Sequence, residues 1–322
     1  MTGHSFETYK QNFERDGFVV MQNALTQQQV RDMNAQLRAW VDESRGHEKA
    51  YGRIADGRPR FDVEPSSHCS ETPALRRISA PIEVSDIYLD VMRNNAALDL
   101  TAHIFSPNIK LHATKINLKL PGSGTAVKYH QDFPFEPHSN DDLVTTLYFL
   151  DDVTLKNGPL EVVPGTHKEV IHSLWHKGVF TGSVSLEVEK NAQKNSIKCV
   201  GKAGTACLMH TRMLHGSLPN NTEKPRRLFI ACYAAEDAIA LDRNHIPSKF
   251  DGEIVRGTKT GRVRTSIFDK PSKSNFSFLM TPQYFHIIKR NSCCRGLTSS
   301  SPFLINLLIF SCARAIVLFD LN

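Results

Sequence analysis

"IKLHATKINLKL", residues 109–120, decides the fold, because its apolar and polar side chains alternate. Ile116 and Leu118 fall on one face of an extended chain, and Lys115 and Asn117 fall on the other. A period of two is typical of a β-strand with one face buried in a hydrophobic core. We therefore expect this stretch to begin a β-sheet domain.

Four further segments rich in β-forming residues follow this strand. They are "DLVTTLYFLDDV" (142–153), "PLEVVPGTHK" (159–168), "GTACLMHTRMLHGS" (204–217) and "RRLFIACYAA" (226–235). Glycine and proline turns separate them, as in antiparallel folds. They predict several short strands close together in sequence.

The part before residue 108 has helical features instead. Thr26 with Gln29 fits a capping box at the start of a helix, and residues 83–105 also carry helical periodicity. The stripe that follows the cap is Val30, Met33, Leu37 and Trp40. Helices followed by many short strands predict an α+β protein with a mainly β core, built as an antiparallel sandwich or barrel.

The composition is that of a globular protein with room for one large core. The chain has 322 residues, of which 40% are hydrophobic and 22% are charged, and its net charge is +6. This charge is too small to indicate nucleic acid as a partner, and it is compatible with an anionic small-molecule substrate. Nothing in the sequence sets the oligomeric state.

The cysteines indicate a reducing compartment. There are seven, no Cys-x-x-Cys occurs, and an odd number fits neither a disulfide framework nor a zinc knuckle. The first ten residues contain no apolar signal-peptide region. We expect a cytoplasmic protein.

The last segment, residues 286–322, differs in composition from the rest. Its apolar run from Phe303 to Ala313 is interrupted at Arg314 and is shorter than the roughly 20 residues of a membrane span. No membrane span is expected. We expect a catalytic domain over residues 1–285, with its core motifs at 110–235, and a C-terminal tail of unknown role over 286–322.

"VKYHQDFPFEPH", residues 127–138, contains the first candidate metal ligands. His130 and Asp132 share one face of a strand, so an imidazole and a carboxylate could bind the same ion. Chance is the competing interpretation, because with 14 histidines such a pair is expected about once at random.

A third ligand would come from another strand. His210 and His215 lie five residues apart, so at most one of them faces the site if the strand is regular. We interpret "LPNNTEK" as a hairpin turn that places Ser217 opposite Arg226, which favours His215. A slip of one residue in that register would exchange Arg226 for Arg227.

Together these motifs make the chain resemble a known family. "YHQD", "NGPLEVVPGTHK" and "HTRMLHGSLPNNTEKPR" resemble the phytanoyl-CoA dioxygenase family of iron(II)- and 2-oxoglutarate-dependent oxygenases, over about residues 13–235. The last motif is the most specific, with His-Gly-Ser and an arginine eleven residues after the histidine. The resemblance implies a double-stranded β-helix, also called a jelly roll and cupin-like, supported by N-terminal helices.

The resemblance also implies roles for individual residues. The iron(II) ligands would be His130, Asp132 and His215. The 2-oxoglutarate contacts would be Arg226 and Ser217, with Tyr148, eighteen residues after the first histidine, and Arg77 as further candidates. By the same resemblance the protein would use O2 to hydroxylate a C–H bond of a small molecule, releasing succinate and CO2. The carboxylate at position 132 favours hydroxylation over halogenation.

Two other functions stay open at this point. The chain could be a jelly-roll binding or sensor protein that has lost catalysis, although the intact ligand and arginine pattern opposes this. It could also be a 2-oxoglutarate oxygenase that acts on a macromolecule, although no groove with interleaved basic and aromatic residues is evident. The substrate itself is not encoded in any motif recognised here.

Overall fold

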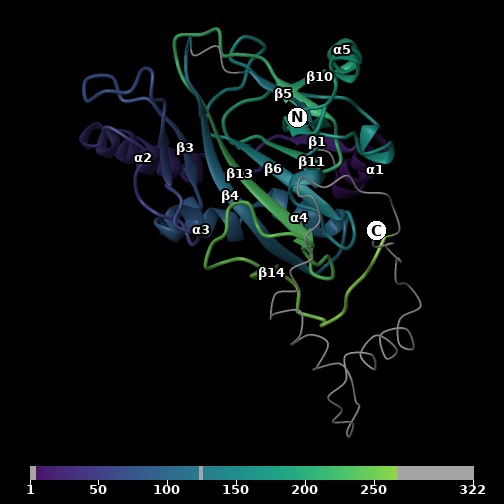
Figure 1. The fold of residues 1–322 in the computed structure, drawn as a ribbon. Coiled ribbons are helices and arrows are strands. Elements are labelled where there is room, and N and C mark those ends of the chain that lie inside the picture. Colours follow the sequence, from purple (N-terminus) through teal and green to yellow (C-terminus); the bar gives the residue numbers. More distant parts are fainter. Residues whose placement is uncertain (1–4, 123–125, 267–322) are drawn as a thin grey trace, which may run out of the picture. The chain divides into compact units, whose positions relative to one another are not determined.

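Two antiparallel sheets form the centre of the protein in the computed structural model, which describes residues 5–122 and 126–266 (Figure 1). In spatial order, the larger sheet contains β1 (Phe18–Met21), β11 (Ala206–His210), β6 (Leu143–Phe149), β13 (Arg226–Ala235), β4 (Ile109–Lys119), β3 (Leu75–Ser79) and β2 (Phe61–Val63), and β14 (Ile254–Arg256) also pairs with β4. The smaller sheet contains β10 (Ile197–Cys199), β7 (Leu160–Val162), β12 (His215–Ser217) and β5 (Val127–His130). A separate hairpin pairs β8 (Trp175–His176) with β9 (Val179–Phe180).

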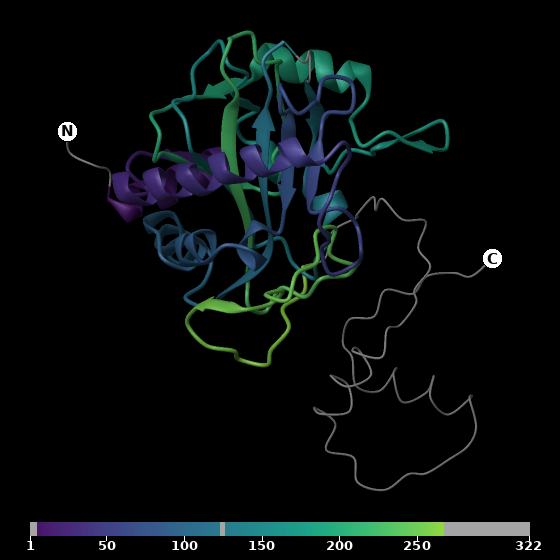
Figure 2. The same cartoon turned by 90° about the vertical axis from the view of Figure 1, so that its left-hand side faces the viewer.

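Most of the helices pack against the larger sheet, whereas the last one contacts β5 of the smaller sheet. The α-helices are α1 (Phe6–Asp16), α2 (Gln27–Glu43), α3 (Asp86–Arg93), α4 (Ala96–Ile104) and α5 (Leu186–Asn195). The 3-10 turns are η1 (Ser44–Gly46), η2 (Pro81–Glu83), η3 (Phe133–Phe135) and η4 (Thr166–Lys168). In Figure 2, α2 crosses in front of the strands of the larger sheet.

The expected start of α2 is confirmed in detail. The Thr26 hydroxyl accepts a hydrogen bond from the Gln29 backbone nitrogen at 3.2 Å, and the Gln29 side chain accepts one from the Thr26 nitrogen at 2.9 Å. The helical stretch at 83–105 is two helices, because the extended backbone of Asn95 interrupts it and its side chain caps α4. An internal cap therefore divides a continuous helical period.

Two apolar layers hold these elements together. Helix residues such as Met33 and Leu37 pack on one face of the larger sheet, against Phe229 and others. Leu147 and Ile230 belong to the other layer, which lies between the two sheets. The β-rich segments predicted from sequence are strands, and the expected α+β class with a mainly β core is confirmed.

The hairpin expected at "LPNNTEK" is wrong. β12 pairs with β5 and β7 in the smaller sheet, whereas β13 pairs with β4 and β6 in the larger one. The segment between them crosses from one sheet to the other, so Ser217 and Arg226 are not paired across a ladder. The turn residues correctly predict that the chain reverses direction here, but they do not show that the strands on either side pair in different sheets.

Two expectations about the chain as a whole meet the structure only in part. The boundary at 285/286 and the tail lie outside the described residues and stay predictions. Within the part of the chain that the structure describes, no helix has the length and apolar character needed to cross a membrane.

Candidate active site

His130, Asp132 and His215 come together where the smaller sheet ends beside the larger one. His130 is the last residue of β5, and the register pairs it directly with His215, the first residue of β12. The Nε2 atoms of His130 and His215 lie 3.4 and 3.6 Å from Oδ1 of Asp132. Two imidazoles and one carboxylate therefore converge on one point, which is the ligand set of non-haem iron(II) oxygenases.

The other ring nitrogens are held by the backbone. His130 Nδ1 lies 2.8 Å from the Lys128 carbonyl oxygen, and His215 Nδ1 lies 2.9 Å from that of Met213. Nδ1–H can therefore donate in both rings, which leaves both Nε2 lone pairs directed at Asp132. The hydroxyl of Thr145 donates to Oδ2 of Asp132 at 2.7 Å and so orients the carboxylate. The residues present fit an iron(II) ion.

Local electrostatics keep these groups in the protonation states that a metal requires. Burial and the neighbouring His130 lower the pKa of His215 to about 4, so its ring is neutral near pH 7. Burial opposes ionisation of Asp132, but His215 and His130 together outweigh it and lower the pKa of that carboxyl below its usual value. A neutral imidazole and an ionised carboxylate bind metal without first losing protons.

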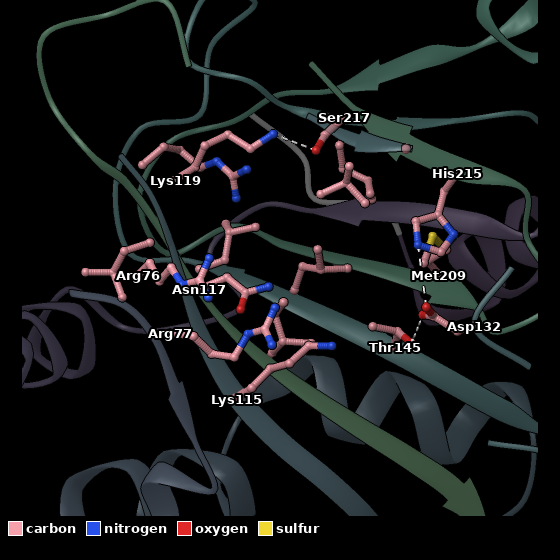
Figure 3. A pocket seen from close by; sticks show the side chains of 18 of the residues that line it. Arg76, Arg77, Lys115, Asn117, Lys119, Asp132, Thr145, Met209, His215 and Ser217 are labelled. Atoms are coloured by element: carbon pink, nitrogen blue, oxygen red, sulfur yellow. Dashed lines mark hydrogen bonds and ion pairs between the residues drawn. The ribbon is translucent and has the colours of Figure 1, made fainter. Parts of the chain in front are cut away.

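A cavity of about 320 Å³ extends from this cluster between the two sheets. Its far wall holds Lys119, Ser217 and Arg226, and Figure 3 shows Lys119 reaching Ser217 at the opposite end of the cavity from Asp132 and His215. The Lys119 ammonium donates to the Ser217 hydroxyl at 2.6 Å. The volume is in the range of small-molecule sites.

Arg226 is a buried cation with no carboxylate bonded to it. It is 5% exposed, Nη2 donates to the Gly158 carbonyl at 2.9 Å, and Nε has no hydrogen-bond partner among the described residues. Burial lowers the pKa of Arg226 to about 10, and burial together with Arg226 lowers the pKa of Lys119 to about 7. A buried charge of this kind is stabilised by an incoming anion.

The neighbouring Arg227 points away from the cavity. It donates to Asp151 through its backbone nitrogen at 2.9 Å and through Nε at 2.8 Å, and Nη2 also donates to that carboxylate. It does not line the cavity. Of the two adjacent arginines, the structure places Arg226 in the cavity. The eleven-residue spacing from His215 selects the same residue, although the hairpin that also favoured it does not exist.

Comparisons with known proteins give a family. A model of the family described as Phytanoyl-CoA dioxygenase (PhyH) matches residues 13–228. The chain belongs to the phytanoyl-CoA dioxygenase family. The resemblance inferred from the motifs is confirmed.

Two relatives are named for activities on different small molecules. A probable alpha-ketoglutarate-dependent hypophosphite dioxygenase from Stutzerimonas stutzeri is 38% identical over 176 residues, which cover 53% of this chain and 60% of that protein. L-proline trans-4-hydroxylase from Streptomyces griseoviridis is 26% identical over 238 residues, covering 68% and 82%. An alpha-ketoglutarate-dependent dioxygenase and a hydroxylase among the relatives, together with the family match, confirm the expected class of 2-oxoglutarate-dependent dioxygenases of small molecules.

A solved structure supports the fold. EctD from S. alaskensis, crystallised with 2-oxoglutarate and 5-hydroxyectoine, superposes with a TM-score of 0.58 at 21% identity, covering 77% of this chain and 80% of that one. The same enzyme has also been solved with bound Fe. The phytanoyl-CoA dioxygenase member described here therefore shares the fold of EctD.

His210, the competing third ligand, lies elsewhere in this phytanoyl-CoA dioxygenase relative. Its ring packs against Phe13 and Phe105, and its Nδ1 accepts a hydrogen bond from the Arg212 backbone nitrogen at 3.1 Å. Burial lowers the pKa of His210 to about 3. It belongs to the packing between the helices and the sheet and is not part of the metal cluster.

The family position carried over to Tyr148 does not reach the cavity, and that expectation is corrected. Tyr148 is fully buried on the helix side of β6, where its hydroxyl donates to Asn95 Oδ1 at 2.9 Å and lies 3.4 Å from the Tyr233 hydroxyl. Its neighbours Thr145 and Leu147 line the cavity. Alternation along β6 places position 148 on the opposite face.

Arg77 does line the cavity, and Lys115 joins it on the same wall (Figure 3). Neither side chain forms a hydrogen bond or ion pair with a described residue, although the cross-strand neighbour Asp62 attracts Arg77. The alternation that places Lys115 and Asn117 on one strand face extends to Lys119, but no motif assigns Lys115 or Lys119 a role. The signal was their spacing of four within an alternating strand, which keeps both on the cavity side.

Proposed function

We propose that the protein is an iron(II)- and 2-oxoglutarate-dependent dioxygenase that oxidises a small anionic molecule and releases succinate and CO2. The observation that carries this proposal is one cavity with His130, Asp132 and His215 at one end and the buried cation Arg226 at the other. A dicarboxylate that reaches the metal with one carboxylate could meet Arg226 with the other.

His130, Asp132 and His215 would hold iron(II) through Nε2, Oδ1 and Nε2. When bound, the ion would supply oxygen activation coupled to decarboxylation of 2-oxoglutarate. The chain's own part is to fix the ligands. Backbone carbonyls set the tautomers of both rings, and Thr145 restrains the carboxylate.

Arg226, Lys119 and Ser217 would bind the distal carboxylate of 2-oxoglutarate. Nε of Arg226 is an unused donor, and the Lys119 ammonium already lies 2.6 Å from the Ser217 hydroxyl. Charge-assisted hydrogen bonds to a carboxylate are about twice as strong as neutral ones, and the burial of this wall limits screening by water.

The charge balance of the cavity supports an anionic substrate. Lys115 and Arg77 line the wall between the two ends, and the Lys115 charge is close enough to lower the pKa values of Asp132 and His215. With 2-oxoglutarate bound at Arg226, these two cations would be left for a second anion. The relative named for hypophosphite, a small oxyanion, is consistent with this class, as are small carboxylates.

We also infer that the two sheets form a double-stranded β-helix. Successive strands β4, β5, β6 and β7 alternate between the larger and smaller sheets, and so do β10, β11, β12 and β13. Two four-strand sheets woven in this way are the jelly-roll arrangement. A cytoplasmic location stays a prediction, supported by the four described cysteines, all of which are free.

The decisive experiment measures succinate release by the purified protein with iron(II), 2-oxoglutarate and O2, with no macromolecule added. A panel of small anions, including hypophosphite and short carboxylates, is compared with neutral and cationic molecules, and mass spectrometry detects the gain of one oxygen. We expect stimulation by an anion. Stimulation by neutral compounds alone would contradict the anionic class, and turnover that requires a macromolecule would favour the alternative oxygenase.

Variants locate the anion within the cavity. Lys115→Gln and Arg77→Gln should raise the KM of the stimulating anion at least tenfold, because each removes one charge-assisted contact. Lys128→Gln is the matched control, since Lys128 is exposed and does not line the cavity. If no anion stimulates turnover and 2-oxoglutarate does not bind, the protein is a silent jelly roll.

A further inference from the structure

A second group of metal-ligating side chains lies outside the cavity. His112, Glu136 and His245 each offer one ligand atom, and these atoms all lie within 4.8 Å of one another. None of the three lines the cavity that contains Arg226. The phytanoyl-CoA dioxygenase motifs do not include these residues.

A β-bulge aims His112 at this point. In the ladder between β4 and β13, Cys232 pairs with Ala113 and Tyr233 pairs with Leu111, so His112 has no partner of its own. A bulge redirects the side chain of the extra residue and changes which faces the following residues occupy. The bulge leaves one residue of β4 unpaired in the ladder, and it turns the His112 side chain to a face that regular alternation would not give it.

The other two residues come from separate segments. Glu136 is the C-cap residue that follows η3, four residues after Asp132. His245 lies in the loop between β13 and β14, and Asn244 anchors that loop by donating from its side chain to the His112 carbonyl at 2.6 Å. Three parts of the chain that are distant in sequence therefore meet at one point.

The ligand atoms of His112 and Glu136 are buried without hydrogen bonds. His112 is 7% exposed and Glu136 is 4% exposed, yet among the described residues His112 Nε2 and Glu136 Oε2 have no hydrogen-bond partner. They lie 3.0 Å apart, but the geometry is not that of an N–H donating to the oxygen. Two buried polar atoms left this way cost free energy unless a third body satisfies both.

We propose that His112, Glu136 and His245 bind a divalent transition-metal ion, zinc by the chemistry of the ligands. Imidazole nitrogens and a carboxylate oxygen bind zinc at about 2.0–2.2 Å, which sets the ligand atoms of a tetrahedral site about 3.4 Å apart. Glu136 Oε2 lies 3.0 Å from His112 Nε2 and 3.8 Å from His245 Nδ1, on either side of that value. The His245 side chain is 25% exposed, which gives an ion and a water ligand access.

The ion would act as a structural clamp. It would tie β4 and the loop before β14 to the segment that follows Asp132. Because Glu136 is four residues from Asp132, fixing it restrains the backbone that carries the carboxylate of the first cluster. The second site does not depend on the proposed oxygenase function.

Zinc stoichiometry tests the proposal. The purified full chain is stripped with chelator, dialysed against excess zinc and then against buffer, and its metal content is measured by mass spectrometry. We expect two zinc ions per chain in the wild type, one in Glu136→Gln and one in Asp132→Asn. If Asp132→Asn holds as much zinc as the wild type while Glu136→Gln loses one ion, the second cluster binds zinc and the cluster of Asp132 does not.

Two further variants keep the result interpretable. His245→Gln changes a partly exposed loop residue, so it should fold and still lose one zinc ion. His176→Gln is its matched control, because His176 is also a partly buried histidine and lies in the β8–β9 hairpin. A single zinc ion in the wild type that is lost in Asp132→Asn but kept in Glu136→Gln and His245→Gln would overturn the proposal, and so would two ions retained in both of these last variants.

Discussion

Replacing Arg226 with methionine tests the co-substrate end of the cavity. The substitution keeps an apolar stem in the buried position and removes the guanidinium, of which Nη2 donates to the Gly158 carbonyl and Nε has no partner in the described part of the chain. Hydrogen bonds to charged groups contribute about 1.5–3 kcal/mol, so 2-oxoglutarate affinity should fall about tenfold to more than a hundredfold. Stability should not fall with it, because the buried cation is opposed by desolvation.

Arg227→Met is the control within the same strand. It removes a half-buried pair with Asp151 and should lower the free energy of unfolding by about 1 kcal/mol. Its 2-oxoglutarate affinity should stay close to that of the wild type, because Arg227 does not line the cavity. The two variants are therefore expected to separate binding from stability.

The assay is calorimetric titration of 2-oxoglutarate into protein saturated with manganese(II), which avoids turnover. Thermal unfolding of the same preparations gives the stability comparison. Equal losses of affinity in the two variants, or a larger loss in Arg227→Met, would refute the placement of Arg226 as the carboxylate anchor. A normal affinity in both would place the dicarboxylate elsewhere.

Three further outcomes are expected. Asp132→Ala should abolish iron-dependent succinate release while circular dichroism shows a retained fold, whereas His210→Ala should keep its iron. If metal analysis finds iron in Asp132→Ala and none in His210→Ala, the ligand set is disproved. Because the pKa of Lys119 is lowered to about 7, its charge is present below that pH and lost above it, so 2-oxoglutarate affinity should fall by up to tenfold per unit between pH 7 and 8.5. Lys119→Met should bind more weakly with no such slope, and an unchanged slope in titrations across this range would exclude Lys119. A chain ending before Asn291 should keep near-normal decarboxylation, and an insoluble or inactive product would show that the tail completes the domain.

Local patterns in the sequence were sufficient for the helices and for the presence of strands. Thr26 and Gln29 form the capping box that their spacing indicates, and the alternating stretch 109–120 contains β4. These features depend only on residues within a few positions of each other, so they can be predicted from a single sequence. The same holds for His130 and Asp132, which lie two residues apart beside a strand end.

Pairing between distant strands could not be predicted in the same way. Turn chemistry predicts a hairpin between β12 and β13. In the structure β12 pairs with β5 on one edge and with β7 on the other, so neither edge is left to pair with β13. The second cluster was also missed. It depends on a bulge at His112 and on a loop that returns to it, and neither has a local signal.

The parity of β6 decides which hydroxyls can serve the cavity. Thr145 donates a hydrogen bond to Asp132, so the odd-numbered positions of this strand face the site, and Leu147 accordingly lines the cavity. Tyr148 must then face the helices, where Asn95 satisfies its hydroxyl. A motif offset counted along the chain fails here because one residue more or less exchanges the two faces of a strand. The hydroxyl at the Arg226 end of the cavity is that of Ser217. It comes from the smaller sheet and lies beside the Lys119 ammonium of β4.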